Sequence, residues 1–300
     1  KVVLSPPASS QALKRGEELV STELCAPVLM ALGLAAEQLE KDVDFVFFPH
    51  TIRERCPAGY SNAYFCCYVQ ACPSMLRSFE ETRSFCEKKL LSPVVDYADF
   101  ETLTEGLYRE LGPKLHLSRK RIRVAVGGAV QALVEFQEKA IKLGEEALSE
   151  IRKRGEYGIV LVGRPYNTLD KGMNLDLPRR IAEMGKIVLF MDMLEVSPNR
   201  VADRYPNMYW QYGQKILSTA DYVASVPDLF PIYFTSFSCG PDSYVLSYFK
   251  EIMAEHGKPY LVLQFDGHGA DAGYLTRIEA ALESFDTSFS RTLHARRAAG

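Results

Sequence analysis

The sequence lacks a charge excess and a long apolar run, and its first residues predict a strand and not a secretory leader. Its 35 Lys and Arg residues against 38 Asp and Glu residues give a formal net charge of −3, which supplies no electrostatic attraction to nucleic acid or to an anionic membrane. Charged residues interrupt every apolar run well before the roughly 20 residues that a membrane-spanning helix needs. We therefore expect a cytoplasmic protein without a nucleic-acid or membrane partner.

Several familiar site patterns are also missing. The sequence contains no pair of C-x2-C motifs, which argues against a zinc ribbon, and neither an H-E-x-x-H motif nor a Ser-His-Asp order. The strand-to-loop turn at residues 163–167 lacks the glycine pattern of a dinucleotide-binding turn or a P-loop. The sequence therefore predicts no ATP site in this chain, and it shows no internal repeat.

Seven cysteines, an odd number, favour a reducing compartment and thiols used as ligands or nucleophiles instead of a disulfide framework. Cys239 stands alone in the second half of the chain. Four of the others lie in residues 50–73, a stretch without clear periodicity, and long irregular stretches in compact domains are usually functional. The first-half cysteines are Cys25, Cys56, Cys66, Cys67, Cys72 and Cys86.

Spacing alone leaves two interpretations of these thiols open. Cys67-x4-Cys72 matches one fragment of the plant-type ferredoxin spacing, but the companion C-x2-C is absent. Free cysteines are also common as small buried hydrophobes, and Cys86 fits that role best. A metal cluster and a set of core thiols both remain hypotheses at this point.

Cys239 is predicted to lie where a strand ends and a helix begins. The apolar residues 230–237 predict a buried strand, Gly240 a tight turn, and Pro241 the first position of a helix. Backbone N–H groups and the positive end of the helix dipole would then face the sulfur and favour its thiolate. The alternative is a half-buried cysteine in an ordinary strand-to-helix turn. In open α/β sheets this edge is also where ligands bind.

The whole chain predicts an α/β fold with two flavodoxin-like, Rossmann-like parallel-sheet domains joined by a long helical connector. We expect a first domain over residues 1–115 with a cysteine-rich loop, a connector over 116–155, a second domain over 156–288 and a frayed basic tail over 289–300. A chain that opens on a strand at 1–5 without Met suggests a piece of a longer protein whose first strand is missing. Further strands are expected at 44–49, 158–163, 187–191, 222–226 and 259–265.

Specific stretches of the second half carry a recognisable pattern. They read VGRPYN at 162–167, MDML at 191–194, NMYWQYGQKIL at 207–217, FSCGPDSY at 237–244, and GKPY at 257–260 onward through DAG at 271–273 and TRIEA at 276–280. Together they resemble the acyl-CoA dehydratase activase-related family. This family is a region of CoA-substrate-specific enzyme activases and is similar to the iron–sulfur subunits of 2-hydroxyacyl-CoA dehydratases. The similarity runs in register through most of residues 1–284.

The resemblance implies an iron–sulfur cluster, a 4Fe-4S cluster first of all, held between the domains by Cys25, Cys66 and Cys239. Cys25 matches the cysteine of a Cys-aromatic-Pro-Val-Lys motif, in which Ala26 and Leu29 here replace the aromatic residue and the lysine. Cys67, Cys56 and Cys72 are alternative ligands. Cys67 could replace Cys66 as the second ligand, or the additional cysteines could enlarge the site to hold a double-cubane 8Fe-9S cluster. Residues expected to contact substrate or to surround the cluster are Arg164, Tyr166, Asn167, Asp242, Ser243 and His268.

The resemblance also implies a role in ATP-dependent low-potential electron transfer of anaerobic metabolism. In relatives of this kind, an ATP-driven activator passes one electron to the cluster protein, and an acyl-CoA thioester is reduced. Three hypotheses follow. The first is a dehydratase-like lyase or reductase component that acts on a CoA thioester or a small substrate. The second is a non-catalytic electron relay or docking module within a larger activase, and the third is a clusterless scaffold or zinc-binding relative. The expected partners are an ATP-dependent activator domain or protein, an acyl-CoA substrate and a second copy of the chain.

Overall fold

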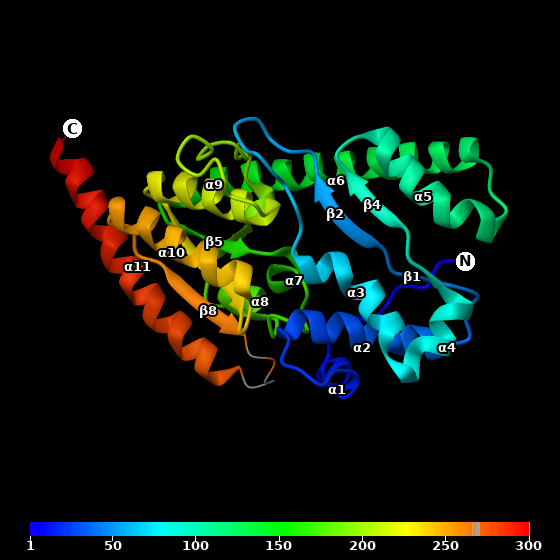
Figure 1. Ribbon diagram of the computed structural model, residues 1–300. Coiled ribbons are helices and arrows are strands. Elements are labelled where there is room, and N and C mark those ends of the chain that lie inside the picture. The colour runs from blue at the N-terminus through cyan, green and yellow to red at the C-terminus, as the bar shows by residue number, and fades with distance from the viewer. Residues whose placement is uncertain (266, 268–270, 300) are drawn as a thin grey trace. The chain divides into compact units, whose positions relative to one another are not determined.

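The computed structural model describes residues 1–265, 267 and 271–299, and the chain divides into two compact units. Unit 1 consists of Lys1–Phe136 and Tyr205–Gln211, and unit 2 of Gln137–Arg204 and Tyr212–Gly300. Both units mix helices with parallel strands, as the sequence predicts (Figure 1). Among the described residues, none of the helices combines the length and the apolar composition that crossing a membrane would require.

Unit 1 contains two small sheets, each of two parallel strands, with β1 paired to β3 and β2 paired to β4. Short strands of this kind depend on the helices packed beside them for stability. The elements in chain order are α1 (Ser10–Leu19), α2 (Ala26–Glu40), β1 (Val46–Phe47), β2 (His50–Glu54), α3 (Cys67–Ser78), α4 (Glu80–Lys89), β3 (Leu90–Leu91), β4 (Val94–Tyr97), α5 (Phe100–Leu115) and the beginning of α6 (Arg119–Arg154).

Two glycines allow α1 and α2 to approach closely. A Cβ atom added at Gly16 would lie 1.9 Å from the carbonyl oxygen of Leu29, and one added at Gly33 would lie 1.9 Å from the carbonyl oxygen of Ala12. These neighbours are backbone atoms, which cannot rotate away as a flexible side chain can. The closeness of α1 fixes the position of α2, the helix that follows Cys25.

The structure corrects three predictions in unit 1. Residues 1–9 form no regular secondary structure, although a strand was expected at 1–5, and Val2 and Leu4 are exposed. An apolar run becomes a strand only when a neighbouring strand pairs with its backbone. The strand expected at 44–49 shortens to β1, and the stretch 50–73 is not wholly irregular, because it contains β2 and the beginning of α3.

Unit 2 is built on one four-stranded sheet in which all strands are parallel and their order is β6-β5-β7-β8. Its strands are long apolar runs, as expected for a parallel sheet covered on both faces. The elements are the end of α6, β5 (Gly158–Gly163), α7 (Pro165–Thr168), α8 (Leu177–Glu183), β6 (Ile187–Phe190), a 3-10 turn (Met191–Met193), α9 (Gln211–Ser225), β7 (Leu229–Ser236), α10 (Gly240–Glu255), β8 (Leu261–Phe265) and α11 (Ala272–Ala299).

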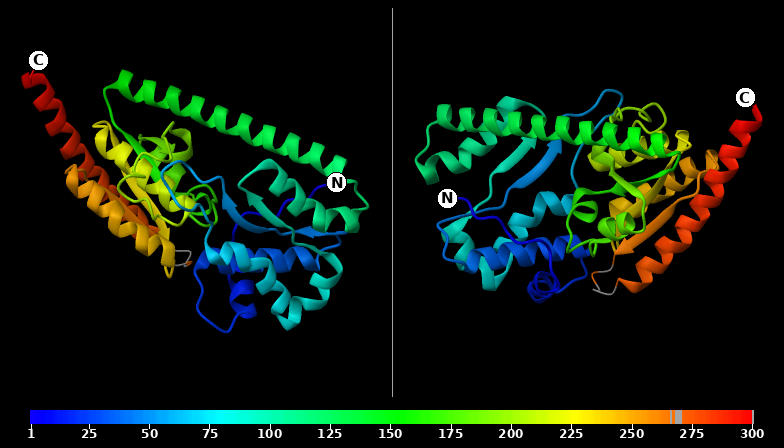
Figure 2. Two further views of the ribbon diagram at one scale, coloured as in Figure 1. Left: turned by 45° about the horizontal axis from the view of Figure 1, so that its top comes forward. Right: turned by 180° about the vertical axis from the view of Figure 1, so that it is seen from behind.

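The sheet lies between layers of helices (Figure 2), and alternate residues of its strands face opposite layers. On one face, Ile159, Ile232 and Leu263 share a buried apolar cluster with side chains of α8 and α11. On the other face, the ring of Tyr233 packs against Phe249 of α10, with 5.0 Å between ring centroids. The sheet is therefore covered on both sides, and ligands can reach it only at its edges.

Three predictions in unit 2 need correction as well. Residues 222–226 were expected as a strand, but α9 continues to Ser225, because Ala220, Val223 and Ala224 keep the helical spacing of buried residues. Helix α11 runs to Ala299 instead of ending in a frayed tail after residue 288. Gly240 is the first residue of α10 and makes no left-handed turn; Ser238 takes that conformation, with φ of 58°.

Candidate functional site

Two thiols of unit 1 lie at the N-termini of helices. Cys25 is the N-cap of α2 and Cys66 the N-cap of α3, and each is about 6% exposed. The carbonyl oxygen of Cys25 accepts a hydrogen bond from the N–H of Val28 at 2.9 Å, and that of Cys66 accepts one from Gln70 at 3.1 Å. The first N–H groups of each helix therefore surround these residues, and the helix dipole favours negative charge there.

Cys72 lies on α3 close to both of these thiols. It is buried, and its pKa is raised from 9.0 to about 12, first by burial and then by the negative charges of Cys25 and Cys66. Burial and the charge of Cys66 also raise the pKa of Cys67, which is exposed. The structure thus places Cys72 within range of the charges of Cys25 and Cys66, and Cys67 within range of the charge of Cys66.

The other two thiols of unit 1 make different contacts. Cys56 is exposed, and its S–H group donates to the carbonyl oxygen of Tyr60 at 3.3 Å. Cys86 is buried on α4 and donates to the carbonyl oxygen of Leu76 at 3.7 Å, as a core thiol does. Among the residues that the structure describes, no three His, Cys, Asp or Glu side chains already form a group able to hold a metal ion.

In unit 2 the candidate site lies at the carboxyl edge of the sheet, between β5 and β7. The chain passes from β5 outward to β6 and then returns across β5 to β7, so these adjacent strands form the topological switch point where open α/β sheets bind ligands. A Cβ atom at Gly163 would lie 2.4 Å from the carbonyl oxygen of Phe234. Glycine there lets β5 end directly beside β7, and Arg164 follows at once.

Cys239 lies at this edge as the N-cap of α10, and it is 5% exposed. Its N–H donates to the carbonyl oxygen of Ser236 at 3.2 Å, which closes the turn through the left-handed Ser238. The N–H and the hydroxyl of Ser243 both donate to the carbonyl oxygen of Cys239 at 2.9 Å. The predicted strand-to-helix position of Cys239 is confirmed, with the turn moved one residue ahead of it.

A buried ion pair lies beside Cys239. Nε of Arg164 donates to Oδ1 of Asp242 at 2.6 Å, and the Thr235 hydroxyl donates to Oδ2 at 3.0 Å. Burial alone would lower the pKa of Arg164, but the negative charges of Asp242, Tyr166 and Cys239 raise it well above the ordinary arginine value. The guanidinium is therefore permanently charged, and its charge acts on the Cys239 sulfur in return.

Buried polar atoms at this edge are left without partners among the described residues. They are Nη2 of Arg164, Nδ2 of Asn167 and the hydroxyl of Tyr233. The Ser236 hydroxyl occupies the other end of the Asn167 amide, donating to Oδ1 at 2.9 Å. An unpaired buried donor costs about 1–3 kcal/mol, so such a group in a folded protein usually has a ligand or a water as partner.

The sequence predicted much of this group of residues. It named Arg164, Asn167, Asp242 and Cys239, which the structure brings together, and Tyr166 and Ser243, which lie near them. His268 lies outside the described residues. The sequence analysis missed the buried polar residues Tyr233, Thr235 and Ser236; the signal was available, because these polar groups interrupt an otherwise apolar strand just before Cys239.

The fold and these residues define a mixed α/β protein with parallel sheets that buries thiols at helix N-termini. Residues 1–194 match the family described as CoA enzyme activase uncharacterised domain. Because this match covers more than half of the sequence, the chain belongs to that family, as the resemblance in its motifs implied. The matched residues 1–194 include Cys25, Cys66 and Arg164, whereas Cys239 lies beyond them. No curated protein matches the sequence.

Proposed function

We propose that this chain is an iron–sulfur protein of the 2-hydroxyacyl-CoA dehydratase and activase type, working in ATP-dependent low-potential electron transfer. The observation that carries the proposal is the surroundings of Cys239. A buried thiol at a helix N-terminus lies beside a permanently charged guanidinium that has a free N–H. Family membership adds a CoA enzyme activase context.

The donor chemistry of the chain fits an iron–sulfur cluster, whose irons are usually held by cysteine thiolates. Cys25 and Cys66 of unit 1 and Cys239 of unit 2 are the proposed ligands, as the family resemblance implies. All three are buried and located at helix N-caps, where backbone N–H groups offset the charge of the sulfurs. When bound, the cluster supplies one-electron transfer at low potential.

Cys72 and Cys67 support a variant of this proposal. Both thiols are affected by the charge of Cys66, so unit 1 holds more thiols in one neighbourhood than three-ligand binding requires. Cys67 or Cys72 could replace Cys66 as the second ligand, or both could enlarge the site so that it holds a double-cubane cluster. Their raised pKa values show that they stay protonated until a cation binds, so loading of metal would release protons.

Arg164 and Asn167 are proposed to surround the group bound at Cys239. Hydrogen bonds to the sulfurs are one of the means by which a protein sets the potential of an iron–sulfur centre. The free Nη2 of Arg164 and Nδ2 of Asn167 are buried donors next to this thiol, and an anionic sulfur would satisfy them. Asp242 keeps the guanidinium in place by its 2.6 Å contact.

The remaining parts of the proposal rest on the family resemblance. The electron donor would be an ATP-dependent activator domain or protein, and the acceptor an acyl-CoA thioester, in the cytoplasm. The two units would be a pair of flavodoxin-like domains, and the chain would be either a dehydratase-like enzyme component or a non-catalytic relay within a larger activase. Turnover of an acyl-CoA by the chain supplied with its activator would separate these two roles.

The test is iron and sulfide analysis of anaerobically purified protein, combined with EPR spectroscopy of the reduced form. We expect stoichiometric iron and sulfide in the wild type and a loss of both in Cys239→Ala. Cys86→Ala is the matched control, because Cys86 is equally buried but packs in the core of unit 1. It should keep its iron, its sulfide and its EPR signal.

Two outcomes would contradict the proposal. The first is wild-type protein without iron after strictly anaerobic preparation, or with zinc in its place, which would favour a scaffold or a zinc-binding relative. The second is equal iron loss in the Cys239 and Cys86 variants, which would indicate unfolding in place of ligand removal. Circular dichroism of both variants distinguishes the second outcome from a true ligand effect.

A further inference from the structure

An apolar groove of about 1090 Å³ lies within unit 1, between β4, α5 and the first half of α6. Its floor is the small core cluster of Val95, Leu103, Ile122 and Val126, all at most 6% exposed. Its walls are formed by further apolar side chains that remain open to solvent. They include Phe47, Tyr97, Val130 and Leu133, which are 54%, 42%, 37% and 49% exposed.

The first half of α6 presents this apolar surface with helical regularity. Ile122, Val126, Ala129 and Leu133 follow one another at spacings of three or four residues and all line the groove. From Arg121 to Leu133 the helix axis covers about 18 Å, at 1.5 Å per residue. The apolar surface thus has the length of a helix of three to four turns.

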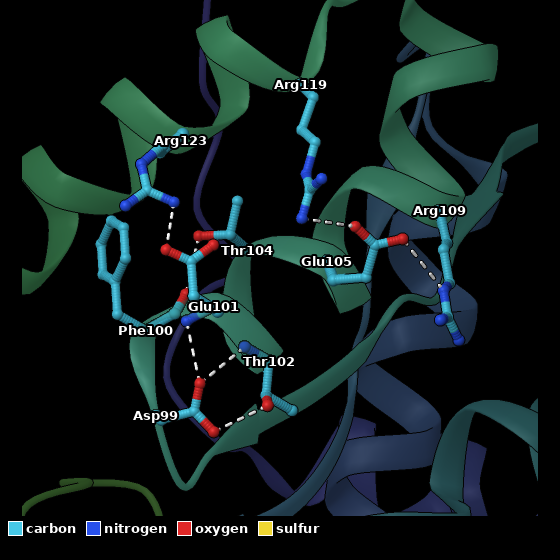
Figure 3. A network of polar contacts seen from close by, with 9 residues as sticks. All are labelled: Asp99, Phe100, Glu101, Thr102, Thr104, Glu105, Arg109, Arg119 and Arg123. Atoms are coloured by element: carbon cyan, nitrogen blue, oxygen red, sulfur yellow. Dashed lines mark hydrogen bonds and ion pairs between the residues drawn. The ribbon is translucent and has the colours of Figure 1, made fainter.

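The groove is held in its present shape by polar contacts between α5 and α6, drawn in Figure 3. Nη2 of Arg119 lies 3.2 Å from Oε2 of Glu105, and Arg123 pairs with Glu101 while its guanidinium lies 5.0 Å from the centre of the Phe100 ring. Asp99 caps the beginning of α5 by accepting the N–H groups of Glu101 and Thr102. The two helices are therefore tied together without any occupant of the groove.

The rim of the groove is positively charged. Arg55 and Arg121 line it, and Lys120 is the neighbour of Arg121. In the part of the chain that the structure describes, none of these three exposed side chains has an acidic partner, whereas Arg119 and Arg123 are both paired. The carboxylate of Asp99 also lines the groove, but it is occupied as a helix cap.

We propose that this groove binds one amphipathic helix of a partner protein, a helix with an apolar stripe and acidic flanks. The length, the apolar floor and the unpaired cations each match one property of such a helix. The volume lies above the roughly 300–1000 Å³ of typical small-molecule pockets, which favours a helix over a compact ligand. The proposal does not depend on the thiols or on a bound cluster.

The test is fluorescence anisotropy of the full chain with two helix-stabilised peptides of about 14 residues. Both carry leucines at i, i+3, i+4 and i+7; one has glutamates on its flanks and the other has lysines. We expect the acidic peptide to bind and the basic one to bind at least about tenfold more weakly, with the difference shrinking as salt is added. Val130→Glu should weaken binding of the acidic peptide at least about tenfold.

Val134→Glu is the matched control, because Val134 is on the same helix and 40% exposed but does not line the groove. It should bind the acidic peptide as the wild type does. Arg121→Glu should reverse the preference between the two peptides. The proposal is overturned if both peptides bind equally or if the two valine variants behave alike. It is also overturned if laurate occupies the groove while neither peptide binds, or if sedimentation shows a dimer that Val130→Glu dissociates and no peptide disrupts.

Discussion

Unit 1 and unit 2 both bury thiols at helix N-termini, but they treat the charge of those thiols differently. In unit 2, Cys239 lies beside Arg164, a buried cation that Asp242 holds in place. In unit 1, burial first and then the charges of two neighbouring thiols, Cys25 and Cys66, raise the pKa of Cys72 to about 12. One unit compensates a negative sulfur with its own cation, and the other brings together sulfurs that repel one another when charged.

This difference indicates what each unit would contribute to binding of the proposed metal. Burial raises the pKa of both Cys72 and Cys67 in unit 1, so deprotonation of these two thiols would be coupled to binding of the proposed metal. Unit 2 keeps a charged guanidinium at Cys239 whether or not a metal is present.

Arg164→Met should destabilise unit 2 by about 3–5 kcal/mol, because it leaves the carboxylate of Asp242 buried without its partner. Urea unfolding followed by circular dichroism measures this loss. Adding Asp242→Asn to the same chain should recover part of it, since the unpaired charge is removed. Arg204→Met is the control: Arg204 pairs with Glu251 and Glu255 at the surface, so its loss should cost less than about 1 kcal/mol. Equal losses for Arg164→Met and Arg204→Met would contradict the role of Arg164 as the buried cation that unit 2 keeps beside Cys239.

Gly33→Ala should destabilise unit 1 by about 1–3 kcal/mol, because the new methyl group meets the backbone of α1 at 1.9 Å. The shift of α2 should also reduce the iron content, since Cys25 caps that helix. Gly128→Ala on α6 has no atom within 4 Å of the new methyl group, so it should stabilise the protein by about 0.4–1 kcal/mol. Thermal unfolding and iron analysis of both variants check the prediction. An unchanged melting temperature in Gly33→Ala would show that the helices can separate freely.

The Cys72 thiol should make the metal-free protein less stable at alkaline pH. Its pKa is about 12 in the folded protein and near 9.0 in the unfolded chain. Between these values the unfolded chain has lost the proton that the folded protein keeps, so rising pH favours unfolding. For each pH unit in this range, the Cys72 thiol lowers the free energy of unfolding by up to about 1.4 kcal/mol. The test is to measure the free energy of unfolding in urea at several pH values between 8.5 and 11. This free energy should fall less steeply with rising pH in Cys72→Ala than in the wild type. In Cys56→Ala, which changes an exposed thiol, it should fall as steeply as in the wild type.

Lys258 should give unit 2 a smaller pH dependence of the opposite sign. Burial lowers its pKa from 10.5 to about 8, an effect that Asp228 partly offsets, and its ammonium donates to the carbonyl oxygen of Val226 at 2.6 Å. Between pH 8 and 10.5 the unfolded chain binds the additional proton, so rising pH favours the folded protein. Lys258→Met should remove this gain, which is at most about 1.4 kcal/mol per pH unit. Lys250→Met, which changes an exposed lysine, should leave the rise of the unfolding free energy with pH unchanged. If the unfolding free energies of the two variants depend on pH in the same way, Lys258 is not the source of this rise.

Local patterns in the sequence were enough to predict many elements and several site residues. The run from Gly158 to Gly163 could only be a buried strand, and the helix Arg119–Arg154 follows from its periodicity. Arg164 directly after that strand, and Cys239 directly before a Pro-containing helix start, already indicated the edge of a parallel sheet. Short-range rules sufficed there, because caps, turns and periodicity act over only a few residues.

Pairings between distant residues were decided by the tertiary structure alone. Arg164 and Asp242 lie 78 positions apart and meet because β5 and β7 are neighbours, an order that the return of the chain from β6 creates. Cys72 joins Cys25 and Cys66 because α3 packs close to the N-terminus of α2. The sequence determined most of the helices and strands and several of the residues at their ends, among them Arg164 and Cys239. Strand order and helix packing decided which of those ends meet, because contacts between distant segments depend on the whole fold and not on local sequence.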